Sequence, residues 1–340
     1  LQINGYAGID FNTPPLTEAD VHQATRLLWR EAVTTYFPTV ITNSDENIEA
    51  LVAAIARACR SDALTAASIR GIHLEGPFLS PEDGARGAHD VRYVKAPDWD
   101  LFRRWQEAAE GLIRIITLSP EWDNAPDFIA RCTDAGVTVS IGHTAATPEQ
   151  IREAVAAGAR MSTHLGNGAH LMLPRHPNYI WEQLAHDELN AGIIADGFHL
   201  PESVLKTFLR AKGKHIFLVS DAVYLSGLKP GRYTTHIGGE VVLTEEGRLH
   251  TAANPQILAG SAQMLTAGIS HLMRTGICTL PEAWQLASER PAEVMRLTGL
   301  GRLQVGAVAD VVTFDFSGGL LTVREVVKAG HKVIASSGSD

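Results

Sequence analysis

Five polar side chains stand at or just past the ends of short apolar stretches, and their types suit metal-assisted acid–base chemistry. The five are Glu75, His143, His164, His199 and Asp221. Glu75 ends the stretch at residues 71–75, and a Gly-Pro pair follows it directly. Because alternate side chains of a β-strand share a face, we expect His73 to point the same way as Glu75.

Glu75, His143 and His164 offer the carboxylate and imidazole ligands that zinc or another divalent ion such as Fe²⁺ prefers. Three protein ligands leave an open position for water, which is the catalytic rather than the structural arrangement. A bound ion lowers the pKa of that water, and a nearby carboxylate can pass the proton to a leaving amine. Asp221 suits this proton transfer, and His199 could hydrogen-bond a developing oxyanion.

Each of these residues also has a structural interpretation when it is taken alone. Asp221 with the following alanine could form only a helix cap. We assign Asp196 a structural role, and we expect His73 to support Glu75 rather than to bind an ion. The observation that favours a joint site is the placement of the candidates on separate strands.

Strand–helix alternation, repeated about eight times, predicts a parallel sheet and fits a closed (β/α)₈ barrel of the TIM type. The predicted strands are residues 1–4, 33–40, 69–74, 112–118, 137–141, 159–163, 190–195 and 215–219. The predicted helices between them are residues 17–32, 44–60, 98–110, 124–135, 148–157, 180–186 and 201–211. A doubly wound open sheet is the alternative, but no GxGxxG follows the first strand. In a barrel, active sites lie at the C-terminal ends of the strands, where the candidates fall.

The alternation breaks after Asp221. Residues 232–251 alternate and contain Gly238-Gly239 and Gly247, which predicts hairpin strands in an excursion over the barrel mouth near residues 224–257. Helices are predicted at residues 261–274 and 280–297, and strands at residues 308–314 and 323–333. We therefore divide the chain into a barrel at residues 1–300 and a remnant of a small β-domain at residues 301–340, which is too short to fold alone.

Composition excludes several classes of protein. The 340 residues carry a net charge of −9 and no Lys/Arg-rich run, which argues against nucleic acid and membrane surfaces as partners. The three cysteines are scattered, so we expect neither a zinc ribbon nor a disulfide framework, and a reduced cytoplasm fits. No apolar run approaches the ~20 residues of a membrane helix, and no signal peptide is visible. The chain starts at Leu1 inside a predicted strand, which leaves room for residues upstream.

The order of the motifs resembles the N-acetylglucosamine-6-phosphate deacetylase family of the amidohydrolase superfamily, over nearly the whole chain. The motifs are HLEGPF at 73–78, GHT at 142–144, THLxN at 163–167, ADGxH at 195–199, SDA at 220–222 and LAGS at 258–261. The resemblance implies that Glu75, His143 and His164 hold the metal. It also implies that Asp221 is the proton shuttle and that His199 contacts the acetamide carbonyl.

Substrate contacts and assembly are also implied by the resemblance. The residues that it assigns to the substrate, besides His199, are Ala88, His89, Asn167, Gly168, Arg175 and the backbone of Leu258, Ala259 and Gly260. In the family the arginine reaches the phosphate across a dimer interface, so a homodimer is expected. The family also has a small β-sandwich built from both chain ends, of which only the C-terminal part is expected here.

The chain departs from the family pattern in two places. Many amidohydrolases carry His-x-His on the first strand and bind a second metal, whereas this chain has Gln2-Ile3-Asn4, so we expect one ion. Residues 166–170 read Gly-Asn-Gly-Ala-His, where the family usually has an aromatic residue and then Asn-Ala-Met, and Arg175 precedes His-Pro-Asn instead of Glu-Pro-Gly. Both changes in this second place lie at the expected phosphate end.

The sequence therefore predicts a cytoplasmic hydrolase that removes the acetyl group from N-acetylglucosamine 6-phosphate. One alternative is a deacetylase of another N-acyl amino sugar, either N-acetylgalactosamine 6-phosphate or an unphosphorylated sugar. Another alternative is a non-catalytic barrel that only binds a sugar.

Overall fold

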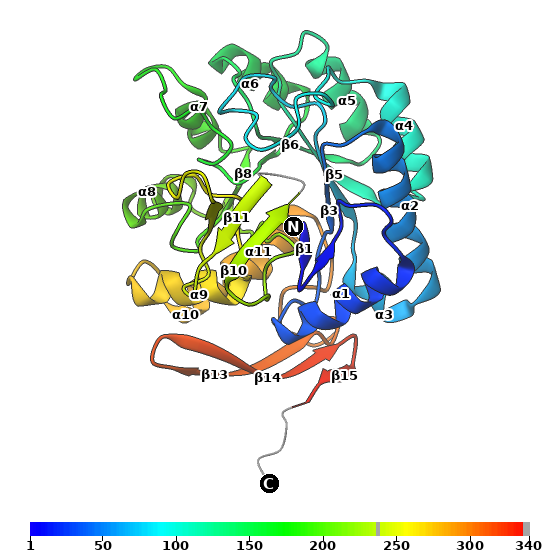
Figure 1. Ribbon diagram of the computed structural model, residues 1–340, viewed down its shortest axis with the longest axis vertical. Coiled ribbons are helices and arrows are strands. Elements are labelled where there is room, and N and C mark those ends of the chain that lie inside the picture. Colours follow the sequence, from blue (N-terminus) through cyan, green and yellow to red (C-terminus); the bar gives the residue numbers. More distant parts are fainter. Residues whose placement is uncertain (236–238, 336–340) are drawn as a thin grey trace.

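A seven-stranded parallel sheet forms the centre of the computed structural model, which describes residues 1–235 and 239–335 (Figure 1). Its strands pair in sequence order, and each is parallel to its neighbours. They are β3 (Thr39–Ile41), β4 (Ile72–Glu75), β5 (Ile113–Leu118), β6 (Thr138–Ile141), β7 (Met161–Ser162), β8 (Asn190–Ile193) and β9 (Ile216–Leu218).

A single residue, Ile3, joins the two edges of this sheet. It forms parallel bridges to Pro38, which precedes β3, and to Ala222, which follows β9. The Thr39 backbone N–H donates to the Ile3 carbonyl at 2.8 Å on one side, and the Asn4 N–H donates to the Ala222 carbonyl at 2.8 Å on the other. The predicted TIM-type barrel is confirmed, and the eighth strand is reduced to this one bridging residue.

Helices cover the outside of the barrel (Figure 1). They are α1 (Glu18–Arg30), α2 (Asp45–Ser61), α4 (Trp99–Ala108), α5 (Ala125–Asp134), α6 (Pro148–Ala157), α7 (Tyr179–Ala185) and α8 (Glu202–Lys212). Capping residues set their starts: Thr17 and Asp20 form a capping box at α1, and Ser44 caps α2. A short helix that the sequence did not predict, α3 (Ala63–Ser68), begins where Asp62 accepts a hydrogen bond from the Thr65 N–H.

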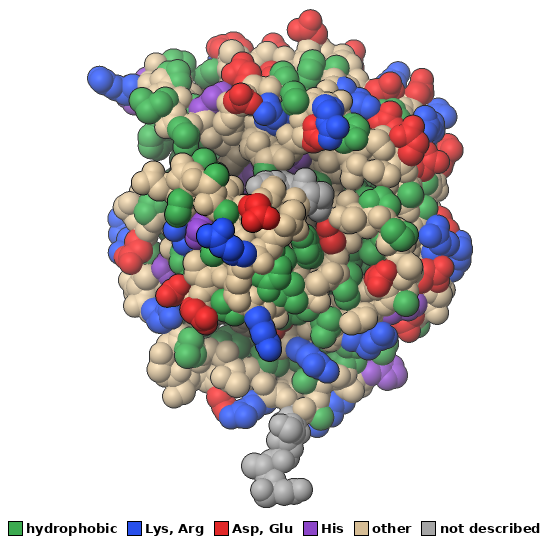
Figure 2. All heavy atoms as spheres, in the orientation of Figure 1, with side chains coloured by type: hydrophobic (Ala, Val, Ile, Leu, Met, Phe, Trp, Pro, Cys, Tyr) green, Lys and Arg blue, Asp and Glu red, His purple; other side chains and the backbone are tan. Residues whose placement is uncertain are grey.

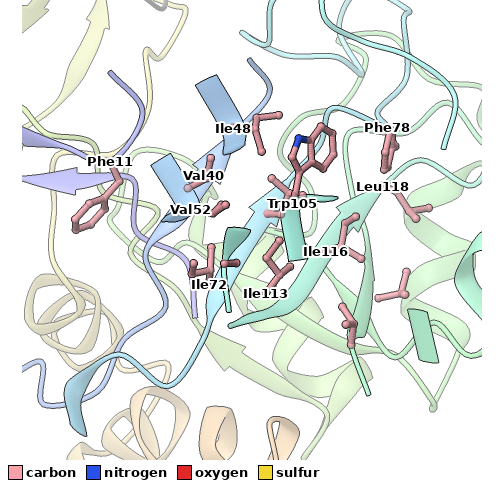
Figure 3. Close-up of a cluster of buried hydrophobic side chains, with 14 of the residues drawn as sticks. Phe11, Val40, Ile48, Val52, Ile72, Phe78, Trp105, Ile113, Ile116 and Leu118 are labelled. Atoms are coloured by element: carbon pink, nitrogen blue, oxygen red, sulfur yellow. The ribbon is translucent and has the colours of Figure 1, made fainter. Parts of the chain in front are cut away.

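The core lies between the strands and the helices. In Figure 3, Ile72, Ile113 and Ile116 of the sheet face Val52 of α2 and Trp105 of α4, and all five are fully buried. Each fully buried side chain of this size contributes about 1.5–3 kcal/mol through removal of apolar surface from water. This packing fixes the positions of the strand ends, on which the candidate site depends.

Two antiparallel additions surround the C-terminal ends of the barrel strands. Residues 5–10 form a hairpin of β1 (Gly5–Tyr6) and β2 (Ile9–Asp10). After β9 comes a three-stranded sheet, β10 (Gly231–Thr235), β11 (Gly239–Leu243) and β12 (Leu249–Thr251), which lies in front of the barrel in Figure 1. It matches the predicted hairpin excursion, although Gly238 lies outside the described residues.

The predicted helix at residues 280–297 is wrong, because the chain forms two helices there. After α9 (Leu265–Arg274) come α10 (Leu280–Ala287) and α11 (Glu289–Val294), separated at Ser288. Pro291 explains the break, because proline lacks an N–H and its ring clashes with the preceding helical turn. The new helix therefore starts just before it, with Pro291 in the first turn.

The C-terminal residues form a small antiparallel sheet of β13 (Val311–Ser317), β14 (Leu320–Lys328) and β15 (His331–Ile334). It packs beneath the barrel against α1, α3 and α9 (Figure 1). The Lys328 ammonium, which is 1% exposed, donates to Asp310 at 2.6 Å and to Thr35 of the barrel at 3.3 Å. The division of the chain at residue 300 stays a prediction. Among the described residues, no helix has the length and apolar character needed to cross a bilayer.

Replacement of Ile3 by alanine should destabilise the barrel, because the Ile3 side chain is only 3% exposed and packs in the core at the point where the backbone closes the ring. We expect the free energy of unfolding, measured by urea titration, to fall by about 2–5 kcal/mol. The matched control Ile257→Ala, at a residue 51% exposed, should change it by less than about 0.5 kcal/mol. Equal effects of the two substitutions would contradict the role of Ile3.

Candidate metal centre and active site

The structure brings the three predicted metal ligands together at the C-terminal ends of neighbouring strands. Glu75 is the last residue of β4, and His143 and His164 each lie two residues beyond β6 and β7. The Nε2 atoms of the two histidines are 3.0 Å apart, and the Glu75 Oε1 lies 3.1 Å from the His164 Nε2 and 3.3 Å from the His143 Nε2. All three residues are buried, and their ligand atoms lie within 4.8 Å of one another.

Hydrogen bonds on the far side of His143 determine which of its nitrogens faces the cluster. The His143 Nδ1 lies 3.0 Å from the Ala85 carbonyl, which can only accept, so Nδ1 carries the proton. The His143 Nε2 therefore presents a lone pair to the cluster. A lone pair beside a carboxylate oxygen is a set of acceptors that a cation satisfies, so these residues fit a divalent ion.

The close contacts within the cluster shift the pKa values of two of its members. Burial by itself lowers the pKa of His164, but its hydrogen bond to Glu75 and the negative charge of Glu75 raise that pKa to about 9. Burial likewise acts to raise the pKa of Glu75, and its contacts with the two histidines hold it well below its usual value. Metal ligands must be deprotonated, so metal binding at such a site releases protons.

A fourth imidazole, that of His89, lies beside the three ligands. Its Nε2 is 3.3 Å from the His143 Nε2, and its Nδ1 is 2.9 Å from the Thr42 Oγ1. The Thr42 hydroxyl donates to the Glu75 carbonyl at 3.4 Å, so it accepts from the His89 Nδ1. Burial lowers the pKa of His89 to about 3, and the neutral ring presents a lone pair at Nε2. His89 therefore offers an acceptor at the edge of the metal cluster.

His73 does not support Glu75 directly, contrary to the expectation from sequence. Its Nδ1 donates to the Leu1 carbonyl at 3.2 Å, and its Nε2 lies 2.7 Å from the Thr117 hydroxyl. Thr117 in turn contacts Thr163 at 2.7 Å, which contacts Ser140 at 2.6 Å. This buried chain of hydrogen bonds ties β4, β5 and β6 to the residue just before His164, directly behind the ligands.

The first residues of the chain hold two of the candidate side chains. The Gln2 Nε2 donates to the Glu75 Oε1 at 2.9 Å, and the Asn4 Nδ2 donates to the Asp221 Oδ1 at 2.7 Å. Sequence reasoning noted Gln2 and Asn4 only as replacements for metal-binding histidines and missed these contacts. Their spacing of two residues on a predicted strand was the available signal, because it places both side chains on one face.

Asp221 lies three residues beyond β9, beside the metal cluster. Burial of its carboxylate and the negative charge of Glu75 raise its pKa to about 6. A carboxylate whose pKa is shifted toward neutrality is suited to take up and release a proton. The backbone φ of Asp221 is 48°, and His143 and His164 have φ of 50° and 28°. Such left-handed values are uncommon outside glycine, and they concentrate at functional sites.

His199 follows β8 in the loop that begins with Asp196. The His199 Nδ1 lies 2.7 Å from the Asp196 Oδ2, and both side chains are buried. The positive charge of His199 lowers the pKa of Asp221, which places the two groups within electrostatic reach of each other. The structure thus brings His199 and Asp221 to the same end of the barrel as the ligands.

Most of the residues that the family resemblance assigned to the substrate lie near the metal-binding candidates. Gly168 packs directly on a metal ligand, because a Cβ at this position would lie 2.6 Å from the His143 ring. The segment at residues 258–260 precedes Ser261, which pairs with Ala222 next to Asp221. Ala88 and Asn167 belong to the loops that carry His89 and Gly168. These residues are therefore near the cluster.

Arg175 is the exception among the predicted site residues. It is exposed, and it makes no hydrogen bond or ion pair with other residues in the described part of the chain. It lies on the loop before α7, which projects from the barrel at the upper left of Figure 1. The structure of one chain does not bring it to the metal cluster.

One cavity between the barrel and the C-terminal sheet lies away from this cluster. Its volume is about 720 Å³, and it is lined by apolar side chains such as Leu280, Trp284 and Phe314 between the barrel and the C-terminal sheet. It contains none of the candidate residues. The chemistry of the side chains, rather than the size of a cavity, therefore locates the site.

Replacement of His143 by asparagine should remove metal binding without straining the backbone, because asparagine tolerates the left-handed region. After reconstitution with Zn²⁺ and dialysis, elemental analysis should find one ion per unaltered chain and less than about a tenth of that in the variant. The control His331→Asn, at an exposed position on β15, should bind as the unaltered chain does. Full occupancy in His143→Asn would exclude this centre.

Comparison with known proteins gives the family. The amidohydrolase family model matches residues 16–334. The N-acetylglucosamine-6-phosphate deacetylase of Bacillus subtilis is 34% identical over 316 residues, which is 92% of this chain and 78% of that protein. The human protein of the same name is 33% identical over 332 residues, 93% of this chain and 78% of that protein.

Solved structures agree with the sequence comparison. The crystal structure of N-acetyl-D-glucosamine-6-phosphate deacetylase from Mycobacterium smegmatis superimposes with a TM-score of 0.87 at 29% identity, covering 98% of this chain and 85% of that one. A D267A mutant of that protein, solved in complex with N-acetyl-D-glucosamine-6-phosphate, gives a TM-score of 0.86 at 28% identity, with the same coverage. The chain therefore belongs to the amidohydrolase family and, within it, to the N-acetylglucosamine-6-phosphate deacetylases.

Proposed function

We propose that this protein hydrolyses the acetamide of N-acetylglucosamine 6-phosphate and releases glucosamine 6-phosphate and acetate. The observation that carries the proposal is the convergence of Glu75, His143 and His164 beside Asp221 in a chain of this family. The alternative of a barrel that only binds a sugar has less support, because the predicted ligands and the acid–base carboxylate lie together at one end of the barrel.

The residues divide the chemistry among them. A divalent ion, zinc in this proposal, would be held by Glu75, His143 and His164, where it would lower the pKa of a water and polarise the acetamide carbonyl. Asp221 takes a proton from the attacking water and returns it to the nitrogen as the C–N bond breaks. The Asn4 side chain donates a hydrogen bond to the Asp221 Oδ1, which leaves Oδ2 for this transfer. His199 donates a hydrogen bond to the oxygen on which negative charge develops.

The proposed assembly is a homodimer. Leu171 and Met172 are 95% and 88% exposed, and Trp181 on the following helix is 52% exposed. Apolar side chains also gather at the upper left of Figure 2, over the region of α7. Clusters of exposed apolar side chains mark interaction sites, and Arg175 lies in the same loop, where it is free to reach a phosphate bound to a second subunit. Three free cysteines support a location in the reducing cytoplasm.

Replacement of Asp221 by asparagine tests the proposed reaction. The unaltered enzyme should release acetate from N-acetylglucosamine 6-phosphate, and the variant should lose at least about 10²-fold in kcat, because the amide cannot accept the proton. Its metal content should be unchanged, because Asp221 is not a ligand and asparagine tolerates the local backbone. Full turnover by a metal-loaded variant would exclude the mechanism.

A second candidate function keeps the reaction and changes the sugar. The altered sequence at residues 166–178 favours a deacetylase of an unphosphorylated N-acyl amino sugar. Rates with N-acetylglucosamine and its 6-phosphate decide between the two.

For the phosphorylated substrate, Arg175→Ala should lower kcat/KM by about 10- to 100-fold, because a charge-assisted contact to the phosphate is lost. The same variant should act on the unphosphorylated sugar at the rate of the unaltered enzyme. Equal rates on both sugars, with no effect of Arg175→Ala on either, would support the second candidate.

A further inference from the structure

The loop after β8 contains a buried aspartate to which the mechanism above assigns no task. We propose that Asp196 is a positioning residue, which sets the orientation and the tautomer of His199 for the reaction. The inference rests on the proposed deacetylation, in which His199 donates to the acetamide oxygen. It replaces the structural role that we expected for Asp196 from the sequence.

The Asp196 carboxylate is held by contacts on both of its oxygens. Oδ1 accepts from the backbone N–H groups of Phe198 and His199 at 2.9 Å each, and Oδ2 lies 2.7 Å from the His199 Nδ1. The side chains of Asp196 and His199 are 4% and 9% exposed. Rotation of the carboxylate would break several hydrogen bonds at once, so its direction is fixed.

The contact with Oδ2 determines which nitrogen of His199 serves the substrate. Burial acts to raise the pKa of Asp196, but the hydrogen bond and charge of His199 and the backbone donors hold it below its usual value. An ionised carboxylate only accepts, so the His199 Nδ1 carries a proton and Nε2 is the nitrogen left for the substrate. Because the carboxylate keeps a proton on Nδ1, Nε2 donates only when the ring carries both protons, and the carboxylate then balances its positive charge.

The rest of the loop keeps this pair in place. Gly197 has φ of 84°, and this left-handed residue lets the chain turn back so that the next two N–H groups reach Asp196. A Cβ at Gly197 would lie 3.0 Å from the Nδ1 of His271 on α9, so the loop packs tightly against that helix. On the other side, the Ser261 hydroxyl lies 3.4 Å from the Asp196 Oδ2, and Ser261 pairs with Ala222. Asp196 thereby links the His199 loop to the segment that carries Asp221.

A double-mutant cycle separates positioning from a purely structural role. Asp196→Asn keeps the size and one acceptor oxygen for the backbone N–H groups, but it places an NH₂ group against the His199 Nδ1. The ring must then accept at Nδ1 and carry its proton on Nε2, without a balancing carboxylate. We expect kcat for acetate release to fall by about 10- to 100-fold, with KM changed by less than about threefold and metal content unchanged.

His199→Asn should lower kcat by about 10²- to 10³-fold, because a donor to the developing charge is lost. If Asp196 acts through His199, adding Asp196→Asn to this variant should change kcat by less than about twofold. The control Asp62→Asn, at the N-cap of α3, where the carboxylate accepts from a backbone N–H at 2.7 Å, should leave kcat unchanged. An Asp196→Asn effect of the same size in both backgrounds, or none in the unaltered background, would overturn the proposal.

A spectroscopic measurement keeps this test distinct from that of the proposed function. In Zn²⁺-loaded protein labelled with ¹⁵N-histidine, the His199 signals are those missing from His199→Asn. Their shifts should move between the Nδ1-H and Nε2-H patterns in Asp196→Asn. An unaltered enzyme that releases no acetate would refute the deacetylation, and unmoved ring shifts would refute the role of Asp196.

Discussion

The confinement of three predicted ligand atoms in a buried pocket is the constraint on which the rest of this site depends. Two imidazole nitrogens and a carboxylate oxygen face one another across 3.0–3.3 Å, and the residues that carry them are each less than a tenth exposed. Such an arrangement needs a positive charge at its centre, because buried charges and lone pairs without a partner are costly. The scaffold must therefore hold the three ligand atoms at these separations.

Hydrogen bonds behind the ligands and side chains from the start of the chain support this arrangement. The hydrogen bonds that link His73, Thr117, Thr163 and Ser140 join β4, β5 and β6 to the residue just before His164. The side chains of Gln2 and Asn4 donate to the carboxylates of Glu75 and Asp221. The left-handed backbone at His143 and His164 turns the chain sharply after each of the two strands, and each ring then points toward the other ligands.

The sequence predicted the parts of this site that follow from local pattern. An apolar stretch that ends in Glu75, and similar stretches before His143 and His164, identified strand ends, and barrel geometry then required them to meet. The partners of His73 and the roles of Gln2 and Asn4 depend on which residues face one another across the closed ring, and no local pattern records that register. Pro291 indicates the break at Ser288, but a prediction based on apolar periodicity alone did not take the proline into account. Arg175 lies on a projecting loop, and the sequence within one chain does not specify what such a loop contacts.

Closure of the barrel by one residue links folding to catalytic competence. Ile3 meets Ala222 only after most of the chain has been synthesised, and the entropy of joining such distant segments opposes this step. Until it occurs, the Asn4 carboxamide lies apart from Asp221, and that carboxylate lacks the donor that orients it. A chain whose ring has not closed would thus contain both predicted imidazole ligands without an oriented Asp221, so we expect activity only after the barrel has closed.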